Sequence, residues 1–491
     1  MQNKKIWLGG LSTLFVIAAM WFSYSAINSM GWFKPKPNIV IVLTDDLDFS
    51  LMPYMENTNR LIAKEGATFT NYFVTSPLCC PSRASMFRGQ YPHNTNILEN
   101  SPGFMNYFRN GRETETIATW LNNKGYKTAL EGKYLNGYPV GAGRNYVPPG
   151  WTDWHAFIYQ TSEGTFYYDY KMNENGPIVQ YGKSPQDYST DVIKKQSINF
   201  IDQSIAEASP FFILISVSAP HGPSTPATRH ADLFPGLVYP KKPSFDEKDT
   251  SDKPTVTYTA AAAGDEFDQY DADVLFRKRV QTVQAVDELV GDVIHLLEQK
   301  GKLENTYIIF TSDNGFHLGE HNIPSGKGYP YEEDIHVPFF IRGPGIQPNS
   351  QITQMSANID IAPTVTEMAH VKSADFIDGR SLMPFLYPQV GVEIPWRKGL
   401  LMETGYMGQG TYPLVYRGVR TETFIYLEYE NGELEYYDLV ADPYELNNAA
   451  KTLDPATLAS LHAWVDQLKK CRADECRTAE MAVPDNLKGT P

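Results

Sequence analysis

The chain has 491 residues, 42% of them hydrophobic, and a formal net charge of -15 at pH 7. The length predicts two domains, or one large α/β domain with an appendage, and the apolar fraction excludes global disorder. The negative charge excludes nucleic acid as a partner, and an anionic substrate would need a local cluster of Lys, Arg and His to bind.

Residues 1–33 have the features of a targeting segment. Lys4 and Lys5 precede an uncharged, mostly apolar stretch at residues 6–22, which would span roughly 25 Å as a helix. That length lies between a signal-peptide core and a membrane span, so a cleaved signal and an uncleaved membrane anchor both stay open. Either would export the rest of the chain to a periplasmic, extracellular or lumenal compartment. A buried N-terminal helix is disfavoured because the stretch has no polar face.

Four apolar runs downstream have the composition of strands that are buried on both faces. They occur at residues 38–43, 126–130, 211–217 and 307–310. Between the last two runs, apolar residues recur at helical spacing from Asp273 to Lys300, and Gly301 is typical of a helix end. Alternating strands and helices predict an α/β sandwich with a large, mostly parallel central sheet. We expect this larger domain to occupy residues 34–385.

The C-terminal part, residues 386–491, has a different pattern. Two alternating runs flank Asn431-Gly432, a strong hairpin turn signal, and a helix is expected after them. The runs cover residues 424–429 and 433–438, and the helix covers residues 454–470. This pattern predicts a smaller α+β domain with an antiparallel sheet. Residues 236–268 show little periodicity and are expected to form a long surface insertion, either a lid over the substrate or a passive loop.

The four cysteines fall into two pairs. Cys471 and Cys476 lie in a polar segment, and in an exported protein they are expected to form a local disulfide. Cys79 and Cys80 are adjacent, which makes a bond between them strained and improbable. The second pair therefore needs another explanation.

Polar residues follow each of the four buried runs. They are Asp45 and Asp46, Glu131 and Lys133, His221, and Asp313 and Asn314. Because ligands of open α/β sheets bind beyond the carboxyl ends of the strands, we expect these side chains at one rim. Two carboxylates about 4 Å apart cost roughly 4 kcal/mol at an effective dielectric near 20, and a cation removes that cost. Oxygen donors favour calcium or magnesium. The alternative is that the aspartates only cap a helix and form a turn.

Several cations are expected at the same rim. Lys133, His221 and Arg83 are candidates for an anion clamp beside the metal, and Lys327 could return to the same place. A single lysine in a loop is usually solvated, and a single histidine after a strand is usually structural. It is the convergence of several cations on one rim that favours a binding function.

The segment Cys79-Cys80-Pro81-Ser82-Arg83 resembles the signature of the sulfatase family, in which Cys-x-Pro-Ser-Arg opens the motif. Residues 84–89 continue the motif as in the family, and further motifs follow in the family's order. These are Asp45-Asp46, Gly132-Lys133, Pro220-His221, Asp313-Asn314-Gly315, Lys327 and Tyr437-Asp438-Leu439. The resemblance spans about residues 37–450.

The resemblance implies an alkaline-phosphatase-like fold and a sulfuric ester hydrolase that uses one calcium ion. A separate maturation enzyme would oxidise Cys79 to formylglycine, whose hydrate attacks sulfur. The implied calcium ligands are Asp45, Asp46, residue 79, Asp313 and Asn314. Arg83 would orient the formylglycine. Lys133, His221 and Lys327 would contact the sulfate or the leaving oxygen, with His221 or Lys327 as the general acid.

One departure from the family pattern concerns the lysine motif. Many sulfatases have His two residues after this lysine, but Leu135 stands there, and His317 is a candidate substitute as an acid or sulfate contact. Residues 132–138 (GKYLNGY) and 148–151 (PPGW) look like the N-acetylglucosamine-6-sulfatase and heparan endosulfatase branch. A sulfated sugar or glycosaminoglycan with a glucosamine-6-sulfate-like ester is therefore the expected substrate.

Two other classes of function stay open on the sequence. An arylsulfatase, or a phosphate or phosphonate ester hydrolase of the same superfamily, would use the same metal rim; a Ser or Thr nucleophile would favour the phosphoester enzymes. A non-catalytic glycan-binding protein would be indicated by lost metal ligands or by a missing motif cysteine. Because every one of these residues is present, a binding protein is the least favoured alternative.

Overall fold

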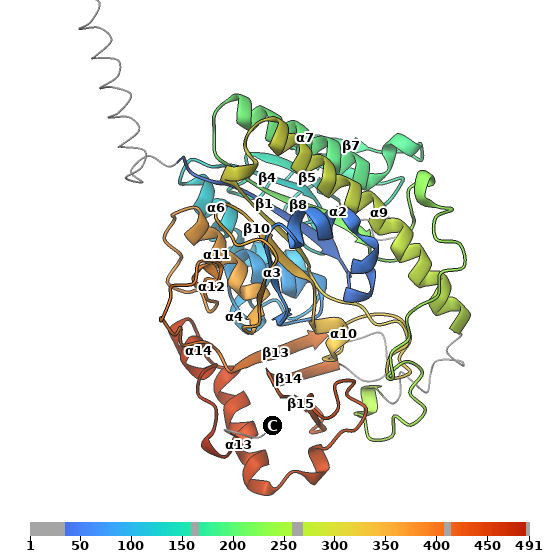
Figure 1. Cartoon of the computed structure of the whole chain (residues 1–491), viewed down its shortest axis with the longest axis vertical. Coiled ribbons are helices and arrows are strands. Elements are labelled where there is room, and N and C mark those ends of the chain that lie inside the picture. Colours follow the sequence, from blue (N-terminus) through green and yellow to red (C-terminus); the bar gives the residue numbers. More distant parts are fainter. Residues whose placement is uncertain (1–34, 159–165, 258–268, 407–413, 488–491) are drawn as a thin grey trace, which may run out of the picture.

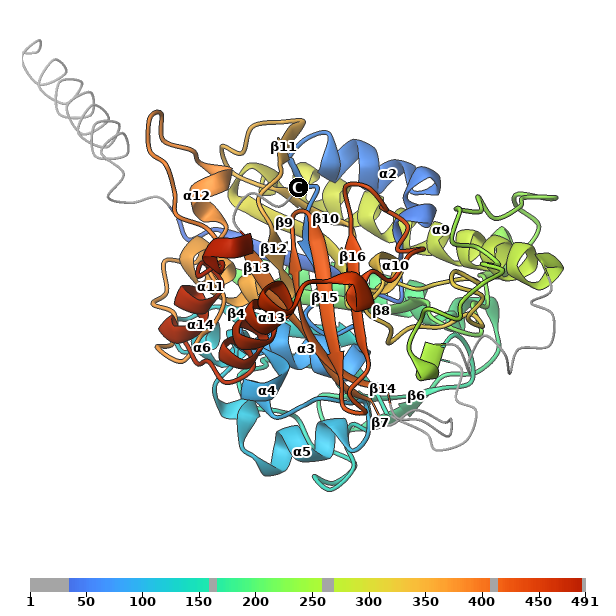
Figure 2. The same cartoon turned by 90° about the horizontal axis from the view of Figure 1, so that it is seen from below.

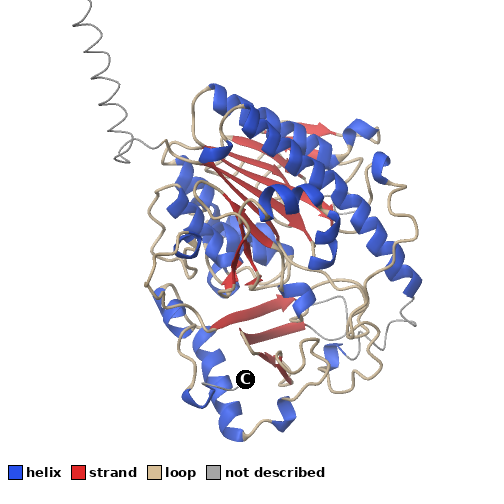
Figure 3. Cartoon of the chain, viewed as in Figure 1, coloured by secondary structure: helices blue, strands red, loops and turns tan. Residues whose placement is uncertain are grey.

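A ten-stranded, mostly parallel sheet forms the centre of the molecule (Figures 1 and 3). The computed structural model describes residues 35–158, 166–257, 269–406 and 414–487. The predicted targeting stretch at residues 6–22 lies outside the described residues. Within the described part, no helix combines the length and the apolar character needed to cross a membrane.

The strands of the large sheet run in the order β11-β2-β10-β9-β1-β8-β4-β5-β6-β7. Their bounds are β1 Asn38–Asp45, β2 Ala67–Phe69, β4 Lys127–Gly132, β5 Asp153–Phe157, β6 Lys171–Glu174, β7 Ile178–Gln180, β8 Phe211–Pro220, β9 Thr306–Ser312, β10 Phe339–Arg342 and β11 Ser350–Ile352. β1 pairs in parallel with β8 and β9, and β4 pairs in parallel with β8 and β5. All four strands predicted from apolar runs are present, and β1 is buried along its whole length. A second, two-stranded sheet joins β3 (Tyr72–Phe73) to β12 (Ser356–Ala357).

Helices cover both faces of the large sheet, which makes the three-layer sandwich that the alternation predicts. On one face, α7 (Ser189–Ala206) and α9 (Gln269–Gln299) lie side by side and share one apolar core with β8 (Figure 1). On the other face, α3 (Cys79–Arg88) and α11 (Ile361–Met368) contribute to a second core. The shorter helices are α2 Glu56–Thr58, α4 Pro92–Thr95, α5 Gly103–Arg109, α6 Ile117–Asn122, α10 Glu332–Ile335 and α12 Met383–Leu386.

The C-terminal part forms the predicted antiparallel sheet, which lies below the sandwich in Figure 1 and in front of α3 in Figure 2. Its elements are β13 Gly399–Tyr406, β14 Leu414–Thr421, β15 Phe424–Tyr429, β16 Leu434–Asp438, α13 Pro455–Leu468 and α14 Asp474–Ala479. The hairpin turn has Gly432 at a φ of +86°, a left-handed conformation that glycine adopts without steric cost. The predicted disulfide between Cys471 and Cys476 is formed.

The predicted insertion is described up to residue 257 and has little regular structure. It is held by polar contacts to helix α10 and to the turn between β15 and β16. Lys242 Nζ lies 2.7 Å from Glu333 Oε1, and Thr255 N donates to Glu433 Oε2 at 2.9 Å. Residues 258–268 lie outside the described residues. The described part of the insertion therefore connects the loop after β9 with the C-terminal sheet.

Candidate active site

Four oxygen-bearing side chains meet at the carboxyl end of the two central strands. Asp45 ends β1 and Asp46 follows it, while Asp313 and Asn314 follow β9. Asp46 has a φ of +66°, a left-handed conformation that is costly for a non-glycine residue and typical of functional turns. Asn314 Nδ2 donates to Asp46 Oδ1 at 2.7 Å, and Asp46 N donates to Asp313 Oδ1 at 3.2 Å. The sequence prediction that these residues share one rim is confirmed.

The donor set fits a hard divalent cation. One ligand atom from each of Asp45, Asp46, Cys79 and Asp313 lies within 4.8 Å of the others, and all four residues are buried. Asn314 Oδ1 is buried and has no hydrogen-bond partner among the described residues. An unpaired buried carbonyl oxygen is costly unless a further ligand satisfies it. Carboxylate and amide oxygens together are the donors that calcium prefers.

Three cationic side chains neutralise the three carboxylates. Lys133 Nζ lies 2.5 Å from Asp45 Oδ2, Arg83 Nε lies 2.7 Å from Asp313 Oδ2, and Lys327 Nζ contacts Asp46 Oδ1. Burial alone would raise the pKa of Asp45, but the charges of Lys133 and His221 lower that pKa to about 2. The pKa of Asp46 is lowered in the same way, because Lys327 and His221 oppose the effect of burial. The carboxylates are thus held ionised in a buried site.

Cys79 is the first residue of α3 and lies inside this charged cluster. Its side chain donates to Asp45 Oδ1 at 3.3 Å, and Lys327 Nζ donates to its Sγ at 2.7 Å. Burial, followed by the charges of Asp313 and Asp45, raises the pKa of the Cys79 thiol. An unmodified thiol in this position stays protonated and is a poor nucleophile. Cys80 points away from the cluster, into the core beside Gly103.

Arg83 is fixed by a network that the sequence analysis missed. Its Nη1 donates to Ser216 Oγ at 2.6 Å and to the carbonyl oxygen of Lys133 at 2.9 Å. Ser216 lies in β8, and a polar residue inside a run of buried apolar ones was the available signal. Gly132 is required between β4 and Lys133, because an added Cβ would lie 2.1 Å from the carbonyl oxygen of Ser216. These contacts fix the course of the backbone at Lys133, directly after the end of β4.

The two candidate histidines differ in their surroundings. His221 follows β8; its Nδ1 is 2.7 Å from the carbonyl oxygen of Gly222, and its Nε2 is 3.8 Å from Asp46 Oδ2. The His221 side chain is 39% exposed, so it reaches both the cluster and solvent. His317 is buried and uses both ring nitrogens within the protein, at 2.8 Å from Asp334 Oδ1 and 2.9 Å from the carbonyl oxygen of Pro324. A sulfate contact by His317 would have to replace one of these bonds.

Comparison with known proteins agrees with this geometry. The family described as Sulfatase matches residues 37–371, and the C-terminal family of N-sulphoglucosamine sulphohydrolase matches residues 319–473. The N-acetylglucosamine-6-sulfatase of Homo sapiens is 35% identical, over 90% of this chain and 86% of its own length. An extracellular sulfatase homologue of Drosophila melanogaster is 36% identical over 75% of this chain and 33% of its own length.

A solved structure extends the agreement to the fold. It is described as a complex with its substrate D-glucosamine-2-N,6-O-disulfate, and it superposes with a TM-score of 0.75 at 27% identity over 89% of this chain and 98% of its own length. The fold and the metal rim define an alkaline-phosphatase-like hydrolase. The chain belongs to the sulfatase family and is a sulfuric ester hydrolase. The family uses formylglycine and a divalent metal ion.

Proposed function

We propose that this enzyme removes sulfate from a sulfated sugar, with a glucosamine-6-sulfate-like ester as the substrate, at a centre built on residue 79. The observation that carries the proposal is the position of Cys79. Its sulfur lies 3.3 Å from Asp45 Oδ1 and 2.7 Å from Lys327 Nζ, at the start of a helix and among oxygen donors. The names of the human relative and of the substrate complex support the sugar class.

Calcium would be held by the oxygen donors at the ends of β1 and β9, together with residue 79. The proposed ligands are Asp45, Asp46, Asp313, Asn314 and residue 79. Calcium supplies positive charge against the sulfate, and formylglycine supplies a hydroxyl nucleophile that a thiol does not. Arg83, already paired with Asp313 at 2.7 Å, keeps the start of α3 in register with the metal ligands.

The cations around the centre divide into two roles. Lys133 and Lys327 are largely buried, and although burial lowers the pKa of a lysine, the neighbouring Asp45 and Asp46 raise the pKa of each. Such lysines stay charged, which suits them to binding sulfate oxygens. We assign the general acid to His221, because Gly222 fixes its Nδ1 and leaves Nε2 to carry the exchangeable proton. Lys327 is the alternative donor, and His317 remains a candidate sulfate contact.

We also propose that the protein acts outside the cytoplasm and depends on a separate maturation enzyme to convert Cys79. Three observations support export: the disulfide between Cys471 and Cys476, the extracellular relative, and the lysine-led apolar stretch at residues 6–22. Whether residues 6–22 are cleaved or remain as an anchor is part of the same proposal. The domain boundaries after residues 33 and 385 also stay predictions.

The test combines mass and turnover. Protein from its native host is digested, and the peptide with residue 79 is weighed, because formylglycine replaces sulfur with oxygen and removes two hydrogens. The same protein is then assayed on glucosamine 6-sulfate and on the matched 6-phosphate, with calcium and with a chelator. We expect the modified mass and calcium-dependent sulfate release only. An unmodified thiol together with phosphate release would instead support a phosphate or phosphonate ester hydrolase.

A further inference from the structure

A cavity of about 600 Å³ lies at the far end of α3 from Cys79, outside the catalytic centre. Its lining includes Arg88, Gln90, Asn94, Asn110, Arg112 and Arg472. The volume falls within the range of about 300–1,000 Å³ that is usual for small-molecule sites. Guanidinium and amide groups dominate this lining, so the cavity has the chemistry of a site for a polar, negatively charged ligand.

Two of the three arginines that line the cavity, Arg112 and Arg472, have no charge partner in contact with them among the described residues. Among the described residues that line it, none is an aspartate or glutamate. Arg112 and Arg472 make no side-chain hydrogen bond or ion pair with any described residue, and Arg112 Nε is buried as well as unpaired. Burial lowers the pKa of Arg88, and the charge of Arg112 acts in the same direction, while Tyr107, Glu115 and Asp378 oppose this shift. Uncompensated guanidiniums that repel one another are relieved by a bound anion.

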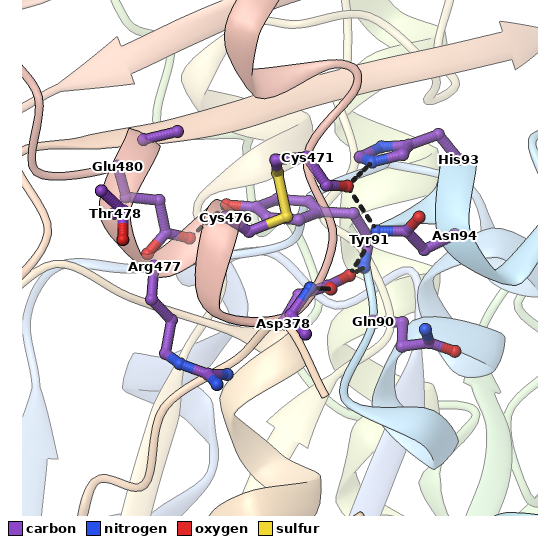
Figure 4. The surroundings of a disulfide bond; sticks show 12 residues. Gln90, Tyr91, His93, Asn94, Asp378, Cys471, Cys476, Arg477, Thr478 and Glu480 are labelled. Carbon is purple, nitrogen blue, oxygen red and sulfur yellow. Dashed lines mark hydrogen bonds between the residues drawn. A yellow bond between two sulfur atoms is a disulfide. The ribbon is translucent and has the colours of Figure 1, made fainter. Parts of the chain in front are cut away.

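The cavity is built by two distant parts of the chain that are fixed to each other. Figure 4 shows His93 and Asn94 directed at the carbonyl oxygen of Cys471, each at 3.0 Å. The neighbouring Asp378 is buried behind the lining, where it accepts from Asn94 Nδ2 at 2.9 Å and from Ala473 N at 2.7 Å. The disulfide closes the loop from which Arg472 projects. The backbone segments that carry the cationic groups are therefore held together before any ligand binds.

Arg88 contributes to the cavity while being held rigidly. Its Nε donates to Gln90 Oε1 at 2.9 Å and its Nη1 to the carbonyl oxygen of Glu115 at 2.7 Å. Arg88 is the last residue of α3 and Cys79 is the first, so about 14 Å of helix separates them. That separation makes the cavity a second site rather than an extension of the sulfate pocket.

We propose that this cavity is a second binding site for anionic saccharides, which takes a sulfate or carboxylate group of a sugar through Arg112 and Arg472. The class of ligand rests on the proposed function, in which the substrate is a sulfated sugar. The chain carries a net charge of -15 and repels such a polymer at long range. A cationic cavity away from the catalytic centre would hold the polymer against that repulsion without occupying residue 79.

The test uses the double variant Arg112→Ala/Arg472→Ala in the full-length enzyme. The control is Arg60→Ala/Lys64→Ala, which removes two exposed cations that lie outside this cavity and so matches the change in net charge. Binding of a heparin-derived tetrasaccharide is measured by calorimetry in a Cys79→Ala background, which prevents turnover. We expect the double variant to lose at least fivefold in affinity and the control to lose less than twofold. Raising the salt concentration should reduce the difference in affinity between the double variant and the control, because exposed charges are screened.

A kinetic arm separates this site from the catalytic centre. For the double variant in the Cys79 background, we expect KM for a sulfated tetrasaccharide to rise by the same factor as Kd, with kcat and KM for glucosamine 6-sulfate unchanged. Equal tetrasaccharide affinity in the double variant and the wild type would overturn the second site. If no form of the enzyme hydrolyses glucosamine 6-sulfate, the proposed substrate fails, while the calorimetric comparison still decides whether the cavity binds.

The nature of the anionic group is decided with modified tetrasaccharides. Loss of binding after desulfation would assign sulfate, and retained binding that disappears on carboxyl reduction would assign carboxylate. Both results support the proposal. Equal binding of a neutral tetrasaccharide, with neither group, would overturn it.

Discussion

Two groups of buried carboxylates in the large sheet have opposite electrostatic surroundings. One is the set of rim aspartates at the ends of β1 and β9, and the other is centred on Glu131 in β4. At the catalytic rim, every aspartate contacts a cation, as Asp45 does with Lys133. Glu131, which lies two residues before Lys133, is fully buried, and its carboxyl group has no hydrogen-bond partner among the described residues. Its nearest acidic neighbours are Asp153, across on β5, and Glu174 on β6. The same sheet thus holds carboxylates that are paired with cations and a carboxyl group that is not.

The comparison shows that burial alone does not decide whether an acid is ionised. Burial raises the pKa in both places, but the cations lower the pKa of Asp45 to about 2. For Glu131, the charges of Asp153 and Glu174 add to burial, so its pKa is well above the ordinary value. The rim aspartates are therefore held ionised, whereas burial and its acidic neighbours favour the protonated form of Glu131.

The largest effect should come from removing the nucleophile. Cys79→Ala should reduce sulfate release by about 10⁴-fold or more while the fold stays intact, because no other group can attack sulfur. The measurement is turnover of glucosamine 6-sulfate, with circular dichroism as the check on folding. Cys80→Ala is the matched control, since this adjacent buried cysteine packs in the core and should be dispensable for turnover. Retained activity in Cys79→Ala would disprove the mechanism.

Breaking the balance at the metal site should have the next largest effect. Asp313→Ala should lose calcium and activity together, by roughly 10³-fold, because a ligand is removed and Arg83 is left buried without its partner. Calcium content and turnover are measured on the same sample. Asp313→Asn keeps the side-chain shape and separates the loss of charge from the loss of packing. Full activity without bound metal would refute the ligand assignment.

Removing a cation from the rim should have a smaller effect. Lys133→Met should lower kcat/KM by about 10²–10³-fold, because a charge aimed at the sulfate is lost. The pKa of Asp45 should rise at the same time, which spectroscopic titration would detect. Lys127→Met, on the same strand but paired with the exposed Glu207, is the control and should keep full activity. If the two variants have equal activity, Lys133 does not contribute to turnover.

The smallest effect concerns the unbalanced acid. Because the folded-state pKa of Glu131 is raised, the native state holds a proton that the unfolded state releases above a pH of about 4.3. Its contribution to stability therefore falls as pH rises, by up to about 1.4 kcal/mol per pH unit, until the folded-state pKa is reached. Glu131→Gln should remove this slope in thermal unfolding between pH 5 and 8, and Glu207→Gln should not. An unchanged slope in Glu131→Gln would show that Glu131 is ionised in the native protein.

Much of the fold and of the site could be predicted because both depend on local signals. Four apolar runs became the central strands, and the polar residues after them meet at one rim because parallel strands end on the same side. Glu131 belongs to β4 rather than to the rim, since the strand continues to Gly132. The position of Ser216 beneath Arg83 could not be foreseen, because it depends on the pairing of β4 with β8 across 83 residues of sequence. The contacts that engage His317 are local, to Pro324 and Asp334, but they lie in a loop without a periodic pattern that would have predicted them.

The burial of Cys79 has a consequence for the order of events during synthesis. In the folded protein Cys79 is 1% exposed and lies under Lys327, which is 248 residues later in the chain. At about 5–20 residues per second, a growing chain needs on the order of ten to fifty seconds to add those residues. The proposed maturation enzyme would therefore have to reach the sulfur before the site closes. The fraction of enzyme molecules that are active would then depend on the rate of the modification relative to the time needed to synthesise the chain from Cys79 to Lys327.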